Sequence, residues 1–122
     1  MKSFVSIFEI PAIDIARAVD FYSTILDIKI ELMDMPDMKM GLFPVEEQAT
    51  FGVIMQGEGY TPSTAGVTIY LDGGHDLQVI LDKVEKNGGK VVAPKTPHAD
   101  ESGFFALFID SEGNRLGLHS LN

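Results

Sequence analysis

Apolar residues along the first half of the chain occur in short strand-like runs around one stretch with helical spacing. Positions 4–10 are rich in β-branched and aromatic residues and are followed by Pro11, which predicts a strand. Asp14 then precedes a stripe at helical spacing and can cap the helix. The stripe consists of Ile15, Ala18, Val19, Tyr22, Ile25 and Leu26. Three more strands are predicted at 28–33, 38–43 and 50–55.

A linker rich in Gly, Pro and Ser, residues 57–66, precedes a second half with the same pattern. A strand at 67–71 and a turn at 72–74 lead to a helix that Gly88 and Gly89 end. The stripe of this helix consists of Leu77, Ile80, Leu81 and Val84. Strands follow at 90–93, 104–109 and 116–120, with residues 110–114 as a hairpin loop.

The order βαβββ therefore occurs twice, in halves of about 60 residues. It predicts one α+β domain over residues 1–122, built from a module at 1–58, the linker at 57–66 and a module at 66–122. A ferredoxin-like α+β sandwich is the main alternative, because it also alternates strands with two helices.

Net charge and composition exclude several partners. The formal charge is −9, from 18 acidic and 9 basic residues, which opposes binding to nucleic acid or to an anionic membrane. A neutral or cationic small ligand is compatible with it. The chain has no cysteine, so disulfides and thiol chemistry are excluded. No apolar run approaches the roughly 20 residues of a membrane helix, and no signal peptide is visible, so we expect a cytoplasmic protein.

Two segments resemble a known superfamily. The first is Phe8-Glu9-Ile10-Pro11-Ala12 with Ala16-Arg17-Ala18-Val19-Asp20-Phe21-Tyr22, and the second is Asp110-Ser111-Glu112-Gly113-Asn114-Arg115-Leu116-Gly117-Leu118-His119-Ser120. They are similar to the two ends of vicinal oxygen chelate domains, which include glyoxalase I, bleomycin-resistance proteins and extradiol dioxygenases. The second segment is most similar to a branch related to lactoylglutathione lyase. The resemblance implies two βαβββ modules forming an open, cup-like barrel of eight mostly antiparallel strands with two main helices.

The resemblance also implies where a metal would bind. Members of the superfamily hold a divalent ion on the inner strand faces, usually through His and Glu. The matching positions here are Ile7, a position near Gly52, Thr68 and Gly117. None is His, Glu or Asp, the usual donors for such ions. We therefore expect no metal of the family type and no other cofactor.

Strand alternation extends this prediction to the lining of the cup. If Ile7 faces the cup, Val5 and Glu9 do so too, whereas Phe4, Phe8 and Ile10 face the helix. The predicted ligand-binding residues are Ile7, Glu9, Thr68, Tyr70, Arg115, Gly117 and His119. A few polar groups among apolar walls are typical of a small-molecule site.

Each polar candidate also has a structural interpretation. Glu9 could hydrogen-bond within the fold, Tyr70 could be a wall residue, and Arg115 could pair with acids of the preceding turn. His75 and His98 are expected to be exposed in turns. The methionines of the first module could fill the core, form a dimer seam or provide an adaptable ligand wall. They are Met33, Met35, Met38, Met40 and Met55.

The leading functional hypothesis is a metal-free protein that binds a small organic molecule. The alternative is an enzyme of the same fold, a lyase, isomerase or dioxygenase, with a displaced metal or with His119 and Glu9 as acid–base catalysts and Tyr70 orienting. A module that binds no ligand is a third class. We expect a homodimer, because open sheet edges need covering.

Overall fold

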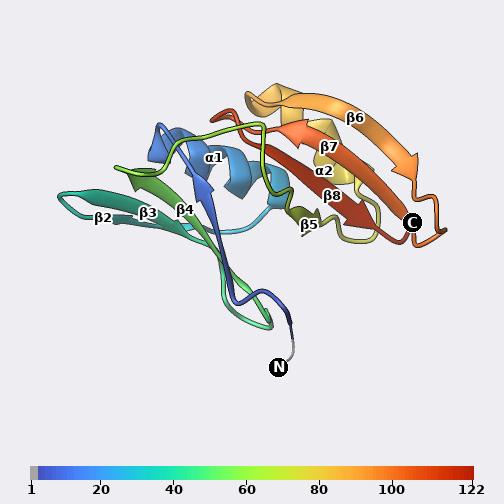
Figure 1. The fold of residues 1–122 in the computed structure, drawn as a ribbon, viewed down its shortest axis with the longest axis horizontal. Coiled ribbons are helices and arrows are strands. Elements are labelled where there is room, and N and C mark those ends of the chain that lie inside the picture. The colour runs from blue at the N-terminus through green and yellow to red at the C-terminus, as the bar shows by residue number, and fades with distance from the viewer. Residues whose placement is uncertain (1–2) are drawn as a thin grey trace. The chain divides into compact units, whose positions relative to one another are not determined.

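The computed structural model describes residues 3–122 and divides the chain between Pro62 and Ser63 into two compact units. Figure 1 shows a sheet and a helix in each unit. The division falls within the predicted linker. The two units have the same architecture, and each is described by itself below.

The first unit contains four strands and one helix. Their bounds are β1 (Ile7–Pro11), α1 (Ile15–Leu26), β2 (Glu31–Asp34), β3 (Met38–Leu42) and β4 (Phe51–Gly57). The strand order in the sheet is β1-β4-β3-β2, with β1 parallel to β4 and the other two pairings antiparallel. A parallel pairing requires a crossover connection, and α1 begins that connection immediately after β1.

Helix α1 begins where the sequence predicts it. The side chain of Asp14 accepts a hydrogen bond from the Arg17 amide at 3.2 Å, so Asp14 is the N-cap. The helix ends at Asp27, whose backbone is left-handed with φ 53°. Its buried residues include Phe21, which is 1 % exposed and was not part of the predicted stripe, whereas Val19 and Leu26 are only half-buried. The buried face is therefore rotated slightly from the predicted one.

The second unit repeats this arrangement. Its elements are β5 (Tyr70–Asp72), α2 (Gln78–Val84), a 3₁₀ turn η1 (Glu85–Asn87), β6 (Lys90–Pro97), β7 (Phe104–Ile109) and β8 (Arg115–Ser120). The order β5-β8-β7-β6 matches that of the first sheet, and β5 is parallel to β8. Gly88 ends the helical segment in the left-handed conformation, as predicted. The fold class is thus confirmed. Residues 3–122 form eight strands in two sheets, with four antiparallel and two parallel pairings, and two main helices.

The structure corrects several strand boundaries. β1 begins at Ile7, and Phe4 is 95 % exposed, so the prediction that Phe4 faces the helix is wrong. Its ladder with β4 starts only where Ile7 meets Phe51. β5 has three residues instead of the predicted five, because its ladder with β8 begins at Tyr70.

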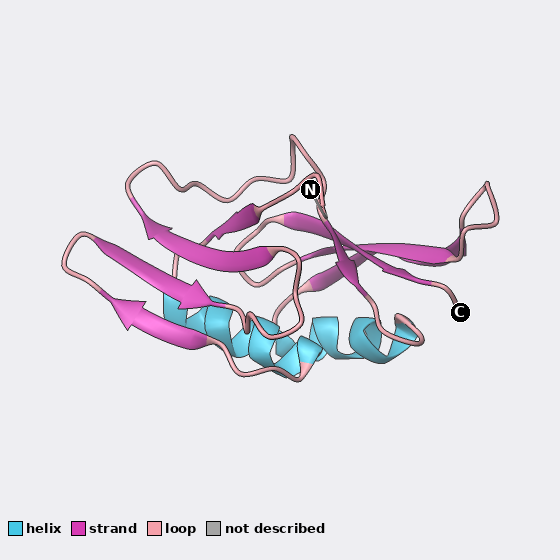
Figure 2. Ribbon diagram, turned by 90° about the horizontal axis from the view of Figure 1, so that it is seen from below, coloured by secondary structure: helices cyan, strands magenta, loops and turns pink. Residues whose placement is uncertain are grey.

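In each unit the helix covers one face of its own sheet (Figure 2). Ile10 and Ile54 lie under α1, and Leu118 and Phe108 lie under α2, all with at most 2 % exposure. The opposite face of each sheet carries the remaining strand residues, because side chains alternate along a strand. No helix among residues 3–122 is long and apolar enough to cross a membrane.

Candidate functional site

The face of the first sheet that points away from α1 carries the predicted residues Ile7 and Glu9. Ile10 is buried under the helix. Side chains alternate along a strand, so Ile7 and Glu9 lie on the opposite face of β1. Ile7 lies opposite Phe51, and Glu9 lies opposite Val53. We call this surface the open face of the first unit. It is defined by Ile7, Glu9, Pro11, Glu31, Met33, Met38, Met40, Leu42, Phe51, Val53 and Met55.

Glu9 is the acidic residue of β1 and contacts Tyr60. The Tyr60 hydroxyl donates to both carboxylate oxygens of Glu9 at 3.1 Å. This hydrogen bond, together with burial and the negative charge of Glu9, raises the pKa of Tyr60 above its usual value. Tyr60 was not among the predicted site residues, since it lies in the Gly- and Pro-rich linker, where no periodicity assigns it to a face.

The position near Gly52 does not belong to the open face, which corrects its assignment to the cup. Gly52 pairs with Phe8 in the β1–β4 ladder. A Cβ atom at Gly52 would lie 2.6 Å from the Phe8 ring and 3.0 Å from the Phe43 ring. Phe43 in turn contacts Tyr22 of α1, so Gly52 faces the helix side. The open-face residues of β4 are Phe51, Val53 and Met55, none of which is a usual metal donor.

In the second unit, Tyr70 and Gly117 are register partners on β5 and β8. The Tyr70 ring lies directly on Gly117, and a Cβ atom at that position would overlap three ring atoms. Tyr70 is nevertheless 47 % exposed. The position where the resembled family places a carboxylate ligand is therefore covered by an aromatic ring.

Thr68 and Arg115 also meet in the second unit. Arg115 Nη2 donates to Thr68 Oγ1 at 2.9 Å. The interpretation of Arg115 as a partner of Asp110 or Glu112 is not what the structure shows, because Asp110 accepts instead from the Glu112 and Asn114 amides. Arg115 Nε is buried and has no hydrogen-bond partner among the described residues.

His119 lies at the far end of β8 beside a second histidine. Its ring is 5.6 Å from that of His98, which also packs against Phe105. His119 Nε2 donates to the Ser102 carbonyl at 2.9 Å, so only Nδ1 can act as a base. The expectation that His98 is simply exposed is wrong, since it is half-buried in this cluster. Glu9 and His119, the two candidate catalytic residues, belong to different units.

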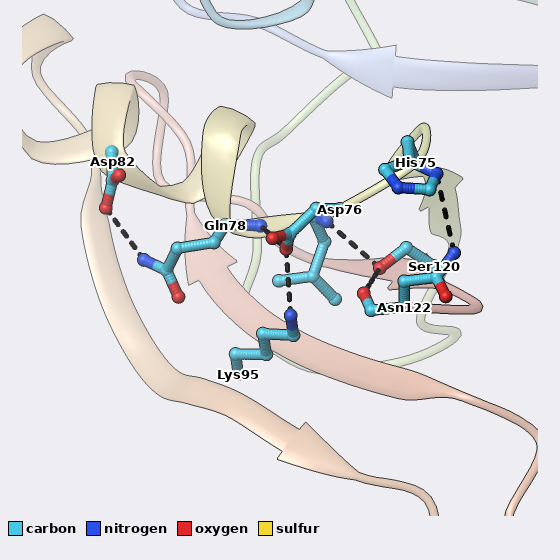
Figure 3. Close-up of polar contacts among 8 residues, drawn as sticks. His75, Asp76, Gln78, Asp82, Lys95, Ser120 and Asn122 are labelled. Carbon is cyan, nitrogen blue, oxygen red and sulfur yellow. Dashed lines mark hydrogen bonds and ion pairs between the residues drawn. The ribbon is translucent and has the colours of Figure 1, made fainter.

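A polar cluster fixes the start of α2, as Figure 3 shows. Asp76 accepts from Lys95 Nζ at 2.9 Å, and this hydrogen bond lowers the pKa of Asp76. Ser120 Oγ accepts from the Leu77 amide and joins β8 to the helix. His75 is exposed here, as expected, beside Asn122 at 3.5 Å. These contacts join elements of the fold, which favours a structural role for the cluster.

The donors at the four family positions do not suit a divalent metal. Ile7 offers no lone pair, Gly52 faces the helix, and Gly117 is covered by Tyr70. The hydroxyl of Thr68 already accepts from a guanidinium, whose charge would also repel a cation. Within residues 3–122 no group of three or more His, Asp or Glu side chains could hold a metal ion.

Comparisons with known proteins agree with this architecture. Residues 5–118 match the model of the Glyoxalase/Bleomycin resistance protein/Dioxygenase superfamily. A "glyoxylase-like domain-containing protein" of Didymella fabae is 33% identical over 111 residues, which are 87% of this chain and 84% of that protein.

Solved structures share the fold at low sequence identity. The antibiotic binding protein TnmS3 from Streptomyces sp. CB03234 superposes with a TM-score of 0.71, at 21% identity and 98% coverage of both chains. A glyoxalase I variant from Zea mays gives 0.75 at 20% identity, and there the match covers 95% of this chain but only 45% of the maize protein. The chain belongs to the Glyoxalase/Bleomycin resistance protein/Dioxygenase superfamily.

Proposed function

We propose that this protein binds a small organic molecule on the open faces of its sheets and does so without a divalent metal. Three facts support the binding function. The family includes binding proteins as well as enzymes, and a structure of the same length and fold is an antibiotic binding protein. The open face of the first unit combines exposed apolar residues such as Ile7 and Phe51 with a single hydrogen-bonded acid. Such a mixture is typical of ligand sites.

The observation that carries the metal-free part of the proposal is the packing of Tyr70 on Gly117. A carboxylate ligand requires a side chain at this position, and the Tyr70 ring fills the space that such a side chain would occupy. The loss of a single ligand could be compensated by a neighbouring residue. Here, however, the residue next to Gly117 is the aromatic Tyr70, and the hydroxyl of Thr68 accepts a hydrogen bond from Arg115.

Metal dialysis tests this part directly. The purified protein is dialysed against zinc, nickel or manganese and then analysed for bound metal. We expect far less than one ion per chain, whereas one tightly bound ion per chain would refute metal-free binding.

A neutral solvatochromic dye, Nile red, tests the binding surface. We expect its fluorescence to rise with saturable binding. Val53→Thr, which adds a hydroxyl to the apolar wall at constant volume, should weaken binding about threefold, because the dye must then desolvate a polar group. Val79→Thr is the matched control on exposed α2 and should leave binding unchanged. No saturable binding, or equal effects of both variants, would count against the proposed surface.

A second candidate is an acid–base enzyme of the same fold. The hydrogen-bonded pair of Glu9 and Tyr60 and the Nδ1 of His119 favour it, because carboxyl, hydroxyl and imidazole groups are the usual general acids and bases. A panel of glutathione hemithioacetals and catechols would test this candidate. It requires turnover that falls strongly in Glu9→Gln or His119→Ala, and absence of turnover on the panel would leave it without support.

A further inference from the structure

Glu9 is surrounded by apolar residues on β1 and β4. The other acid of the open face, Glu31, is exposed on β2 at the opposite edge of the sheet, beyond Val53 and Leu42 in the same cross-strand row. The neighbours of Glu9 along β1 on the open face are Ile7 and Pro11, and its register partner on β4 is Val53. The diagonal neighbours on β4 are Phe51 and Met55, which are apolar as well. Side chains at these distances share one surface. The carboxylate is therefore surrounded on its own sheet by hydrocarbon, sulfur and aromatic groups.

This carboxylate has a hydrogen-bond donor but no counter-ion. The Tyr60 hydroxyl donates to both oxygens, and no Lys, Arg or His among the described residues pairs with Glu9. Each carboxylate oxygen can accept a further hydrogen bond, because it has two lone pairs. Tyr60 holds the group in one orientation and leaves its negative charge uncompensated. A cation brought to this position would find an oriented partner.

The surface beside Glu9 suits the apolar body of a ligand. Met55, Met40 and Met33 are successive register partners across β4, β3 and β2. Met55 is buried, so the accessible methionine row on the open face consists of the half-buried Met40 and the exposed Met33. Methionine side chains are flexible and polarisable, and they adapt to flat apolar or aromatic groups. The chain as a whole carries a formal charge of −9, which attracts cations and repels anions.

From this arrangement we propose that the ligand is a flat, apolar molecule carrying one protonated nitrogen. The nitrogen donates to the Glu9 carboxylate, and the apolar body lies over Val53 and the methionine row. This inference rests on the proposed binding function and specifies the class of ligand. It also assigns Tyr60 as a positioning residue that acts through Glu9.

Three acridines that share one ring system and differ in charge test the proposal at pH 7.5. 9-Aminoacridine is a cation, acridine is neutral, and acridine-9-carboxylate is an anion. In fluorescence titrations we expect 9-aminoacridine to bind about tenfold more tightly than acridine, the usual gain from a charge-assisted hydrogen bond. The anion should bind most weakly.

Substitutions show which carboxylate makes the protein prefer the cationic acridine. Glu9→Gln should remove the preference for the cation and bring 9-aminoacridine binding to the level of acridine, because it removes the charge and keeps the shape. Asp20→Asn makes the same change in net charge on exposed α1, which covers the other face of the sheet, and should keep the preference. Tyr60→Phe should reduce the preference only in part, because the charge of Glu9 remains.

The possible failures are distinguishable. If Nile red binds but the three acridines bind equally, or if Glu31→Gln and not Glu9→Gln removes the preference, the proposed function stands and this inference is overturned. If Nile red binds and no acridine does, the inference is likewise overturned. If neither Nile red nor any acridine binds, both the function and the inference fail.

Discussion

Tyr70 and Gly117 depend on each other at the residue scale. Gly117→Ala adds a methyl group where the Tyr70 ring lies, so the ring must move away from β8. We expect a loss of about 1–3 kcal/mol in the free energy of unfolding, the usual cost of overpacking. Urea denaturation measures it. Because Tyr70 is partly exposed and can swing outward, the value should fall in the lower half of that range.

A double-mutant cycle shows whether the cost of Gly117→Ala comes from the Tyr70 contact or from placing any side chain at this position of β8. In a Tyr70→Ala background the space above Gly117 is free, so Gly117→Ala should cost much less than in the parent protein. Equal costs in both backgrounds would mean that the ring does not determine the residue at this position.

The contact between Tyr60 and Glu9 predicts a pH-dependent signal. The pKa of Tyr60 is raised, mainly by its hydrogen bond to the Glu9 carboxylate. The stability that this bond contributes is therefore fully present below the ordinary tyrosine pKa of about 10 and is lost as the pH rises through the higher folded value. In Glu9→Gln, the tyrosinate absorbance of Tyr60 should appear at lower pH. Tyr60→Phe identifies the transition, and an unchanged transition in Glu9→Gln would contradict the assigned cause.

The sheet face of a candidate residue could be predicted only where a motif fixes the register. Ile7 and Gly117 are flanked by recognisable segments, and their strands place them as strand alternation requires. Gly52 lies between two strands without such a motif, so a slip of one residue moved it to the wrong face. Tyr60 lies 51 residues from Glu9 in sequence, and no local pattern could join them.

At the scale of elements, the start of α1 depends on its cap. Asp14→Ala removes the acceptor of the Arg17 amide hydrogen bond and should destabilise the protein by about 1 kcal/mol. Thermal or urea unfolding measures the change. Asp20→Ala, in the exposed middle of the same helix, is the matched control and should have little effect, since alanine favours helix. Equal losses in both variants would argue against capping as the cause.

The helices were easier to predict than the strands because their signals are local. An N-cap and an apolar stripe suffice to place α1 within a few residues, and an apolar stripe with a terminal glycine suffices for α2. The length of a strand depends instead on its partner. The run from Phe4 to Ile10 is mostly apolar, yet only the part from Ile7 onward is in the ladder with β4. β6 extends to Pro97, beyond the predicted residue 93, because β7 is long enough to pair with it through two irregularities.

On the scale of the whole molecule, the repeat seen in the sequence is confirmed by the topology. Both sheets have the order first-fourth-third-second, with a parallel pairing between the first and fourth strands. Residue identity between the halves is poor, so the repeat is preserved in the pattern of apolar positions and turns. The feature that the two modules share is a sheet with one face buried under its helix. The faces that point away from the helices differ, with methionines in the first unit and Tyr70, Arg115 and His119 in the second.

The same comparison supports a proposal about assembly, namely that the protein is a homodimer formed through its first unit. β2 is an edge strand of the first sheet, and all four of its residues are exposed. Leu32 is 48 % exposed and Met33 is 38 % exposed, so this edge presents two apolar side chains between the acids Glu31 and Asp34. The edge strand β6 of the second sheet is better protected, because it contains two prolines and two irregularities in its pairing. A twofold contact between the β2 strands of two chains would cover the exposed β2 edge. Twofold symmetry is the commonest for homo-oligomers.

Light scattering at micromolar concentration should therefore give twice the chain mass of 13.3 kDa. Leu32→Lys places a charge in the proposed contact and should shift the mass toward that of one chain. Val92→Lys makes the same kind of change on the other edge strand, where Val92 is 50 % exposed, and should leave the dimer intact. A mass of 13.3 kDa that does not change on concentrating the parent protein would show that it is a monomer. Dissociation by Val92→Lys alone would instead place the contact on the second unit.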